Sequence, residues 1–80
     1  MEKIFTIELD KEEEAIELHL NKTGAEYLRN ILDRLISNNK NEHLHLMSSD
    51  WGGDELSSNQ QNLNADVELL HQLKIMYWSE

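Results

Sequence analysis

The spacing of apolar residues constrains the fold of this chain most strongly, because it changes along the sequence. Residues 3 to 9 (KIFTIEL) and residues 14 to 20 (EAIELHL) each alternate apolar and polar side chains. A period of two predicts β-strands with one face turned toward a core. The charged stretch at 10–13 is short, so we expect these two strands to form a hairpin.

The period then lengthens to that of a helix. Thr23 is followed three residues later by Glu26, the pattern of a capping box in which each side chain satisfies a free backbone N–H of the other. Helical spacing follows, over Ala25, Leu28, Ile31, Leu32, Leu35 and Ile36. The Ser-Asn-Asn sequence at 37–39 predicts the end of the helix, because asparagine tolerates left-handed conformations.

Beyond the helix the pattern is again that of strands and loops. Residues 42–47 alternate, which predicts a third strand with Leu44 and Leu46 on one face. Residues 48–64 are mostly polar and predict a long loop, with a short helical turn near 54–58. For the tail we expect a turn or short helix at 65–70 and a strand at 71–78, where Ile, Tyr and Trp favour extended backbone.

These elements predict one α+β domain over residues 1–80. The order β-β-α-β-β favours a two-layer sandwich, in which the helix packs on one face of a mostly antiparallel four-stranded sheet. The expected core face carries Phe5, Ile7, Leu9, Ile16, Leu18, Leu20, Leu44, Leu46, Ile75 and Tyr77. The opposite face carries Thr6, Glu8, Glu17, His19, His43, His45, Met47, Met76 and Trp78. This face is either an open surface for binding or pairing, or it is covered by the long loop, which would fold back with Trp51 as a plug.

The amino-acid composition limits which kinds of binding partner and which cellular compartment we expect. The net charge is −9, from 16 acidic and 7 basic residues, which disfavours nucleic acid and anionic membranes and favours a basic protein partner. The chain has no cysteine and no long apolar run, and its first residues do not resemble a signal peptide. We therefore expect a cytoplasmic protein without a membrane span.

The sequence contains few signals of a catalytic or metal-binding site. His43 and His45 lie two residues apart on one strand face, and with His19 they could bind zinc, although the chain has no H-E-x-x-H motif or cysteine to support it. No carboxylate or serine stands in a recognisable catalytic motif. We expect neither an enzyme nor a cofactor, and the histidines are more typical of a surface.

Trp51, followed by Gly52 and Gly53, supports two interpretations. As a structural residue, it would pin the long loop to the edge of the core, with the glycines allowing the backbone to turn beneath it. As a functional residue, it would be an exposed anchor for another protein, because interface hot spots favour tryptophan.

The stretch from His43 to Leu56 resembles the immunity protein 32 family of bacterial polymorphic-toxin systems. The matching residues are His43-Leu44-His45-Leu46-Met47, then Ser48-Ser49-Asp50, then Trp51-Gly52-Gly53 and Leu56. The resemblance implies a non-catalytic immunity protein that binds and neutralises a cognate toxin in the cytoplasm. A nuclease is one toxin class that would suit an acidic inhibitor.

The residues expected to bind that basic toxin are Asp50, Trp51, Asp54, Glu55, His43, His45 and Trp78. Two alternatives remain open at this point. One is a homodimeric interaction domain that pairs through the open sheet face, and the other is a zinc-binding protein that uses His19, His43 and His45.

Overall fold

The computed structural model describes residues 2–79. In chain order the elements are β1 (Phe5–Asp10), β2 (Ala15–Leu20), α1 (Lys22–Asn38), β3 (Glu42–Met47), the 3₁₀ helix η1 (Ser49–Trp51), β4 (Val67–Leu70) and β5 (Gln72–Tyr77). The α+β class, the hairpin, the helix and the third strand are confirmed. Among the described residues, no helix has both the length and the apolar character needed to cross a membrane.

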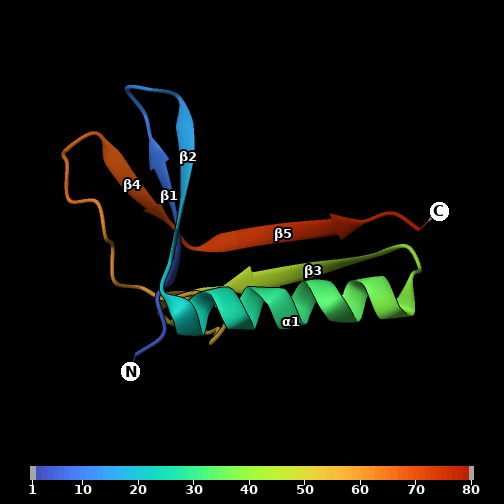
Figure 1. Ribbon diagram of the computed structural model, residues 1–80. Coiled ribbons are helices and arrows are strands. Elements are labelled where there is room, and N and C mark those ends of the chain that lie inside the picture. Colours follow the sequence, from blue (N-terminus) through green and yellow to red (C-terminus); the bar gives the residue numbers. More distant parts are fainter. Residues whose placement is uncertain (1, 80) are drawn as a thin grey trace.

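The strands form two antiparallel sheets, and the prediction of a single four-stranded sheet was wrong. One sheet has the order β2-β1-β4, and the other is the two-stranded ribbon β3-β5. Figure 1 shows the two sheets at a steep angle, so that the molecule has the shape of an L. We call residues 5–20 and 66–70 the arm, and residues 22–47 and 72–77, which include α1, the leg.

The tail divides between the two sheets. Residues 67–70 are strand β4 rather than the expected turn or short helix, because they pair with the free edge of β1 and satisfy its backbone hydrogen-bonding groups. The chain then bends at His71, whose carbonyl accepts a hydrogen bond from the backbone N–H of Ser48 at 3.0 Å. Strand β5 leaves this bend along β3 and away from the arm (Figure 1).

Helix α1 begins two residues earlier than a Thr23 cap requires. Its N-cap is Asn21, whose Oδ1 accepts the backbone N–H of Gly24 at 2.9 Å, so the predicted capping box was wrong. The same oxygen accepts the N–H of Ile4, which ties the helix to the start of β1. The helix ends at Asn38, as expected, with Asn39 in the left-handed conformation.

The core lies where the arm, α1 and β3 meet. It contains Phe5, Ile7, Ile31, Leu35, Leu46 and Leu56, all of them buried. The register pairs Phe5 with Leu20, Ile7 with Leu18 and Leu9 with Ile16, so the predicted faces of β1 and β2 are correct. However, Ile16, Leu18 and Leu20 are exposed rather than buried, because α1 follows the ribbon and leaves the arm uncovered.

The opposite face of the arm is covered by the long loop, which is one of the two alternatives expected for it, although Trp51 is exposed and is not the plug. The segment after η1 returns past β1 and fastens to it, so Thr6 and Glu8 are completely buried. The short helical turn occurs at Ser49–Trp51 rather than near 54–58. The long polar loop is therefore held to the sheet by specific hydrogen bonds.

Candidate partner-binding site

The predicted binding residues around Trp51 lie together in residues 49–55, which we call the corner loop. It leaves the end of β3 at the junction of arm and leg. Ser48, which precedes it, is completely buried and its hydroxyl is hydrogen-bonded to Nδ1 of His71 at 2.7 Å. The carbonyl of Ser48 accepts the backbone N–H groups of Trp51 and Gly53. These bonds fix the start of the loop to the bend in the tail.

Trp51 is 57% exposed and does not enter the core. Its ring stacks on that of His71, with centroids 5.3 Å apart and an angle of 12° between the planes. Gly52 has φ +87°, a left-handed conformation that favours glycine. Gly53 passes so close to β3 that a Cβ there would lie 2.4 Å from the carbonyl oxygen of Met47. The glycines thus turn the backbone while the stacked imidazole orients the indole.

Three carboxylates accompany Trp51. Asp50 and Asp54 are exposed, and Glu55 is half-buried. The Glu55 side chain accepts the backbone N–H of Met47 at 2.9 Å, and this hydrogen bond lowers the pKa of Glu55 despite its partial burial. Glu55 therefore remains ionised and closes the loop, whereas Asp50 and Asp54 present their charge to solvent.

The residues that anchor the loop are Leu56 and Ser57, rather than Trp51. Leu56 is buried in the core, and its N–H donates to the carbonyl of Met47. The Ser57 hydroxyl accepts the N–H of Phe5 and donates to the carbonyl of Lys3, and the Ser57 N–H donates to the carbonyl of Phe5. The structural interpretation of Trp51 as the pin is therefore wrong. Two sequence signals pointed to Leu56: it is an isolated leucine in a polar stretch, and it closes the Trp51-Gly52-Gly53 pattern.

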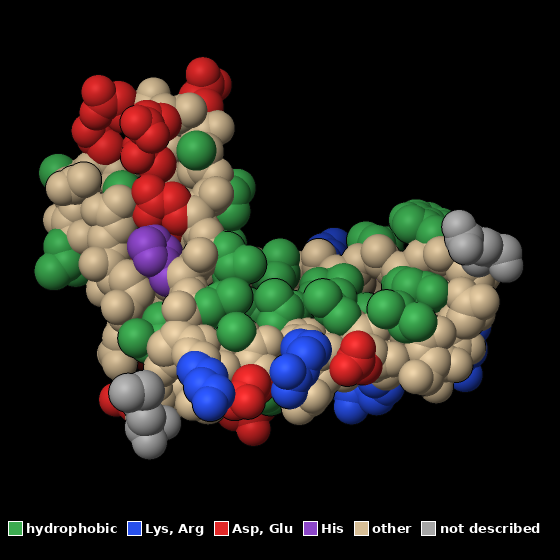
Figure 2. Space-filling view, viewed as in Figure 1, with side chains coloured by type: hydrophobic (Ala, Val, Ile, Leu, Met, Phe, Trp, Pro, Cys, Tyr) green, Lys and Arg blue, Asp and Glu red, His purple; other side chains and the backbone are tan. Residues whose placement is uncertain are grey.

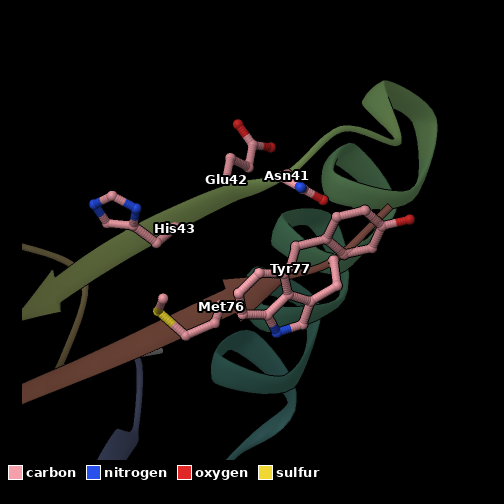
Figure 3. Close-up of a pocket in the computed structure, with 6 residues that line it drawn as sticks. Asn41, Glu42, His43, Met76 and Tyr77 are labelled. Atoms are coloured by element: carbon pink, nitrogen blue, oxygen red, sulfur yellow. The ribbon is translucent and has the colours of Figure 1, made fainter. Parts of the chain in front are cut away.

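His43, His45 and Trp78 lie elsewhere, on the face of the ribbon that turns away from α1. His43 pairs with Met76 and His45 with Lys74, and the two imidazoles are in edge contact with centroids 5.2 Å apart. Near Trp78 the ribbon has a hollow of about 150 Å³ (Figure 3). It is lined by Asn41, Glu42, His43, Met76, Tyr77 and Trp78. A six-residue strand spans roughly 17–20 Å, so the two tryptophans occupy opposite ends of the ribbon.

The histidines do not form the predicted zinc set. His19 lies on β2 in the arm, while His43 and His45 lie on β3 in the leg. Over residues 2–79, the group with metal-ligand spacing is instead Glu8, Glu17 and His19. The sequence did not predict this group as a unit.

Hydrogen bonds show what the group around Glu8 does. Glu8 accepts the hydroxyl of Thr6 at 2.6 Å and the backbone N–H groups of Gln61 and Asn62 at 2.9 Å each. Burial raises the pKa of Glu8, but these donors outweigh it and leave the pKa below its ordinary value. Glu17 accepts His19 Nε2 at 2.8 Å and the Asn62 amide at 3.1 Å. The carboxylates are thus engaged in fastening residues 61–62 to the arm.

Charge is divided unevenly along the L. The arm holds eight of the acidic residues against one lysine, Lys11, so its net charge is −7. The leg holds five basic residues against three acidic ones, a net charge of +2. Figure 2 shows acidic side chains at the tip of the arm and basic ones along the leg. The corner loop adds the three further negative charges around Trp51.

No family model, curated protein or solved structure matches this chain. The resemblance to the immunity protein 32 family therefore stays a prediction that rests on residues 43–56.

Proposed function

We propose that this protein is a non-catalytic immunity protein, and that its corner loop docks on a basic surface of the cognate toxin. The observation that carries the proposal is the exposed indole of Trp51, held in one orientation against His71 and accompanied by Asp50, Asp54 and Glu55. A rigid aromatic anchor loses little conformational entropy on binding, and such residues contribute most of the energy of protein interfaces.

Electrostatics supports a basic partner. The corner loop and the arm together concentrate negative charge on one half of the molecule, which accelerates encounter with a positive surface. Because exposed charges are screened by salt, this contribution weakens as ionic strength rises. The partner expected on this argument is a toxin domain with a basic active-site cleft, such as a nuclease.

The rigidity of the loop also favours binding over catalysis. Glu8 is buried and Glu55 is half-buried, and both side chains accept hydrogen bonds from backbone N–H groups. These bonds lower the pKa of both carboxyl groups, so both are poor proton donors at neutral pH.

The test is a calorimetric titration with the toxin domain encoded beside this gene. We expect tight binding at 50 mM salt that weakens at 300 mM salt. Trp51→Ala should weaken it by about 30-fold or more, as expected for a hot spot of about 2 kcal/mol. Trp78→Ala is the matched control, because it removes an exposed tryptophan at the other end of the ribbon. Equal losses in both variants would move the docking site to the ribbon, and no binding by the wild type would overturn the proposal.

A further inference from the structure

The outer edge of strand β2 is left unpaired within residues 2–79. The strand order β2-β1-β4 puts β2 and β4 at the two edges of the arm sheet. At the β4 edge the chain covers itself, because the N–H of Val67 donates to the carbonyl of Asn64 and the carbonyl of Val67 accepts the Gln60 amide. The β2 edge has no such cover. An unpaired row of backbone N–H and C=O groups is a place where another strand can add to the sheet.

The hydrogen bonding of β2 shows which of its residues form this edge. The N–H of Asn21 donates to the carbonyl of Ile4 at 3.2 Å, so the backbone groups of Asn21 point toward the N-terminal strand. Backbone groups alternate in direction along a strand. Those of Ile16, Leu18 and Leu20, which lie five, three and one positions before Asn21, therefore point away from β1 and toward the open side of the sheet.

The side chains of these three residues are also apolar and exposed. Their exposed fractions are 60% at Ile16, 49% at Leu18 and 37% at Leu20. The register with β1 runs unbroken over all six residues of β2, which include neither proline nor lysine, so the usual devices that protect an edge are missing from this strand. Figure 1 shows β2 on the side of the arm toward the leg, and Figure 2 shows the molecule hollowed there. A regular, apolar edge of this kind marks an association site.

We propose that β2 pairs with β2 of a second copy of this chain, so that two arm sheets form one continuous antiparallel sheet. The two-fold axis passes between the two copies of Leu18. Leu18 then lies opposite Leu18 of the partner subunit, and Ile16 lies opposite Leu20 of the partner subunit. Each of these pairs exchanges two backbone hydrogen bonds, because its N–H and C=O groups point across the interface. The apolar side chains lie opposite one another on the same face, where such pairs stabilise a sheet.

The polar residues of β2 favour this register over its neighbours. On the other face of the sheet, it sets Glu17 opposite His19 of the partner subunit, twice per dimer. A shift of the partner by two residues would instead place Glu17 opposite Glu17, or His19 opposite His19. A carboxylate accepts a hydrogen bond from an imidazole, whereas two carboxylates directly opposite each other repel. The edge is thus complementary to itself, which favours a second copy over an unrelated strand.

The net charge of −9 on each copy opposes association, but the arrangement keeps the strongest charges apart. The acidic tips at 12–14 lie at opposite ends of the dimer, about 33 Å apart along the strands, which is well beyond the screening length of about 8 Å. Each tip comes to the junction of the other copy, where the start of α1 carries Lys22 and Glu26, whose charges cancel. Salt should therefore strengthen the dimer, whereas it weakens the proposed binding of the toxin.

The wild-type protein provides the first test. Sedimentation equilibrium should show a shift from monomer to dimer between about 2 and about 200 µM, with more dimer at high salt. Amide exchange at Ile16, Leu18 and Leu20 should slow over the same range, because these N–H groups gain partners only in the dimer. A protein that is monomeric at the highest concentration, or a dimer in which these three amides exchange as fast as in the monomer, would overturn the proposal.

A proline at each edge of the arm sheet gives a matched pair of variants. Leu18→Pro removes an N–H that has no partner within one copy, and proline is tolerated at such an edge position. It should raise the dissociation constant of the dimer about 10-fold or more, because two hydrogen bonds are lost at the axis. Leu69→Pro makes the same change at the outer side of β4 and should leave the dimer intact. Leu18→Lys, which sets two ammonium groups opposite each other, should also dissociate the dimer, so the test stands if the proline variant does not fold. Equal association by the Leu18 and Leu69 variants would contradict the proposed edge.

Cross-linking then tests the register. The chain has no cysteine, so each cysteine variant carries a single thiol. A short thiol cross-linker should join two copies of Leu18→Cys, because residues directly opposite have Cβ atoms about 4.5–5.5 Å apart. It should join Ile16→Cys to Leu20→Cys but not Ile16→Cys to itself, since those two thiols lie about 13 Å apart along the strand. Equal yields in all three mixtures would contradict the register. The proposal is independent of the proposed function, because a monomer that binds the toxin overturns the dimer alone.

Discussion

Glu8 accepts a hydrogen bond of 2.9 Å from the backbone N–H of Asn62, a residue 54 positions away in the sequence. With the bonds from Thr6 and Gln61, it holds the returning loop against β1. A buried carboxylate is stable only when such donors satisfy it, so the loop and the strand depend on each other.

We therefore predict that Glu8→Gln destabilises the fold by about 2–3 kcal/mol at pH 7, because the amide turns an N–H₂ group toward backbone donors and leaves one of them unpaired. Urea denaturation measures the change, and amide exchange at residues 61 and 62 shows where it acts. Glu13→Gln, at the exposed turn, is the matched control and should change the stability by less than about 0.5 kcal/mol. Equal effects in both variants would contradict the role of Glu8.

The same carboxylate should make stability depend on pH. The pKa of Glu8 in the folded protein lies below its ordinary value of 4.5, so the unfolded chain takes up the proton first as the pH falls. The stabilisation is complete above about pH 4.5 and is lost as the pH falls through the lower, folded value. Urea midpoints between pH 7 and pH 3 should show the gap between wild type and Glu8→Gln shrinking at acid pH. A constant gap would rule out this linkage.

The cap of α1 gives a direct comparison between two neighbouring residues. Asn21→Ala should cost about 1–2 kcal/mol, because Asn21 accepts N–H groups from both Gly24 and Ile4. Thr23→Ala, which would remove the cap predicted from the sequence, should cost less than about 0.5 kcal/mol, since Thr23 is an exposed residue inside the helix. Thermal unfolding followed by circular dichroism at 222 nm distinguishes the two assignments, and the reverse order would restore Thr23 as the cap.

Alanine substitutions of the two leucines in the long loop should differ strongly in their effect on the stability of the fold. Leu56→Ala opens a cavity in the core and should cost about 2–4 kcal/mol, whereas Leu63→Ala, at an exposed position, should be nearly neutral. Chemical denaturation of the two variants measures this. A small effect of Leu56→Ala would mean that the corner loop is held by its hydrogen bonds alone.

Much of the local structure could be predicted because it follows from short-range patterns. The alternation in residues 3–9 and 14–20 gave the correct faces of the hairpin, and the asparagines at 38–39 marked the helix end. The cap was misassigned because Asn21 and Thr23 both fit a helix start, and only the nearby backbone of Ile4 decides between them. The local residue pattern at 21–26 gives no information about the hydrogen bond between Ile4 and Asn21.

The two-sheet arrangement could not be predicted, because alternation does not say which strand a segment pairs with. The apolar residues of the tail fit a helix from Val67 to Leu73 and a strand from Leu73 to Tyr77. In the structure the chain instead changes partners at His71, where β4 leaves β1 and β5 joins β3. The fastening by Glu8 was missed for the same reason. A glutamate on a strand face is ordinarily exposed, and the donors that bury it lie more than 50 residues away.

The residues predicted to bind a partner divide between two places in the structure, and their role in binding stays a prediction. Asp50, Trp51, Asp54 and Glu55 do lie together, whereas His43 and Trp78 lie on the ribbon. Sequence identified Trp51 as either a pin or an anchor, and its stacking on His71 decides for an exposed orientation. His71 itself carried no signal, because its place beneath the indole depends on the bend between β4 and β5.

The most direct test of the account is a footprint of the cognate toxin domain on the ¹⁵N-labelled protein, read from amide chemical shifts. We predict that the largest changes occur at residues 49–55 and at the indole N–H of Trp51, with residues 16–20 and 28–36 unchanged because they lie outside the corner loop. A footprint confined to those two segments, with the corner loop unaffected, would contradict the central claim.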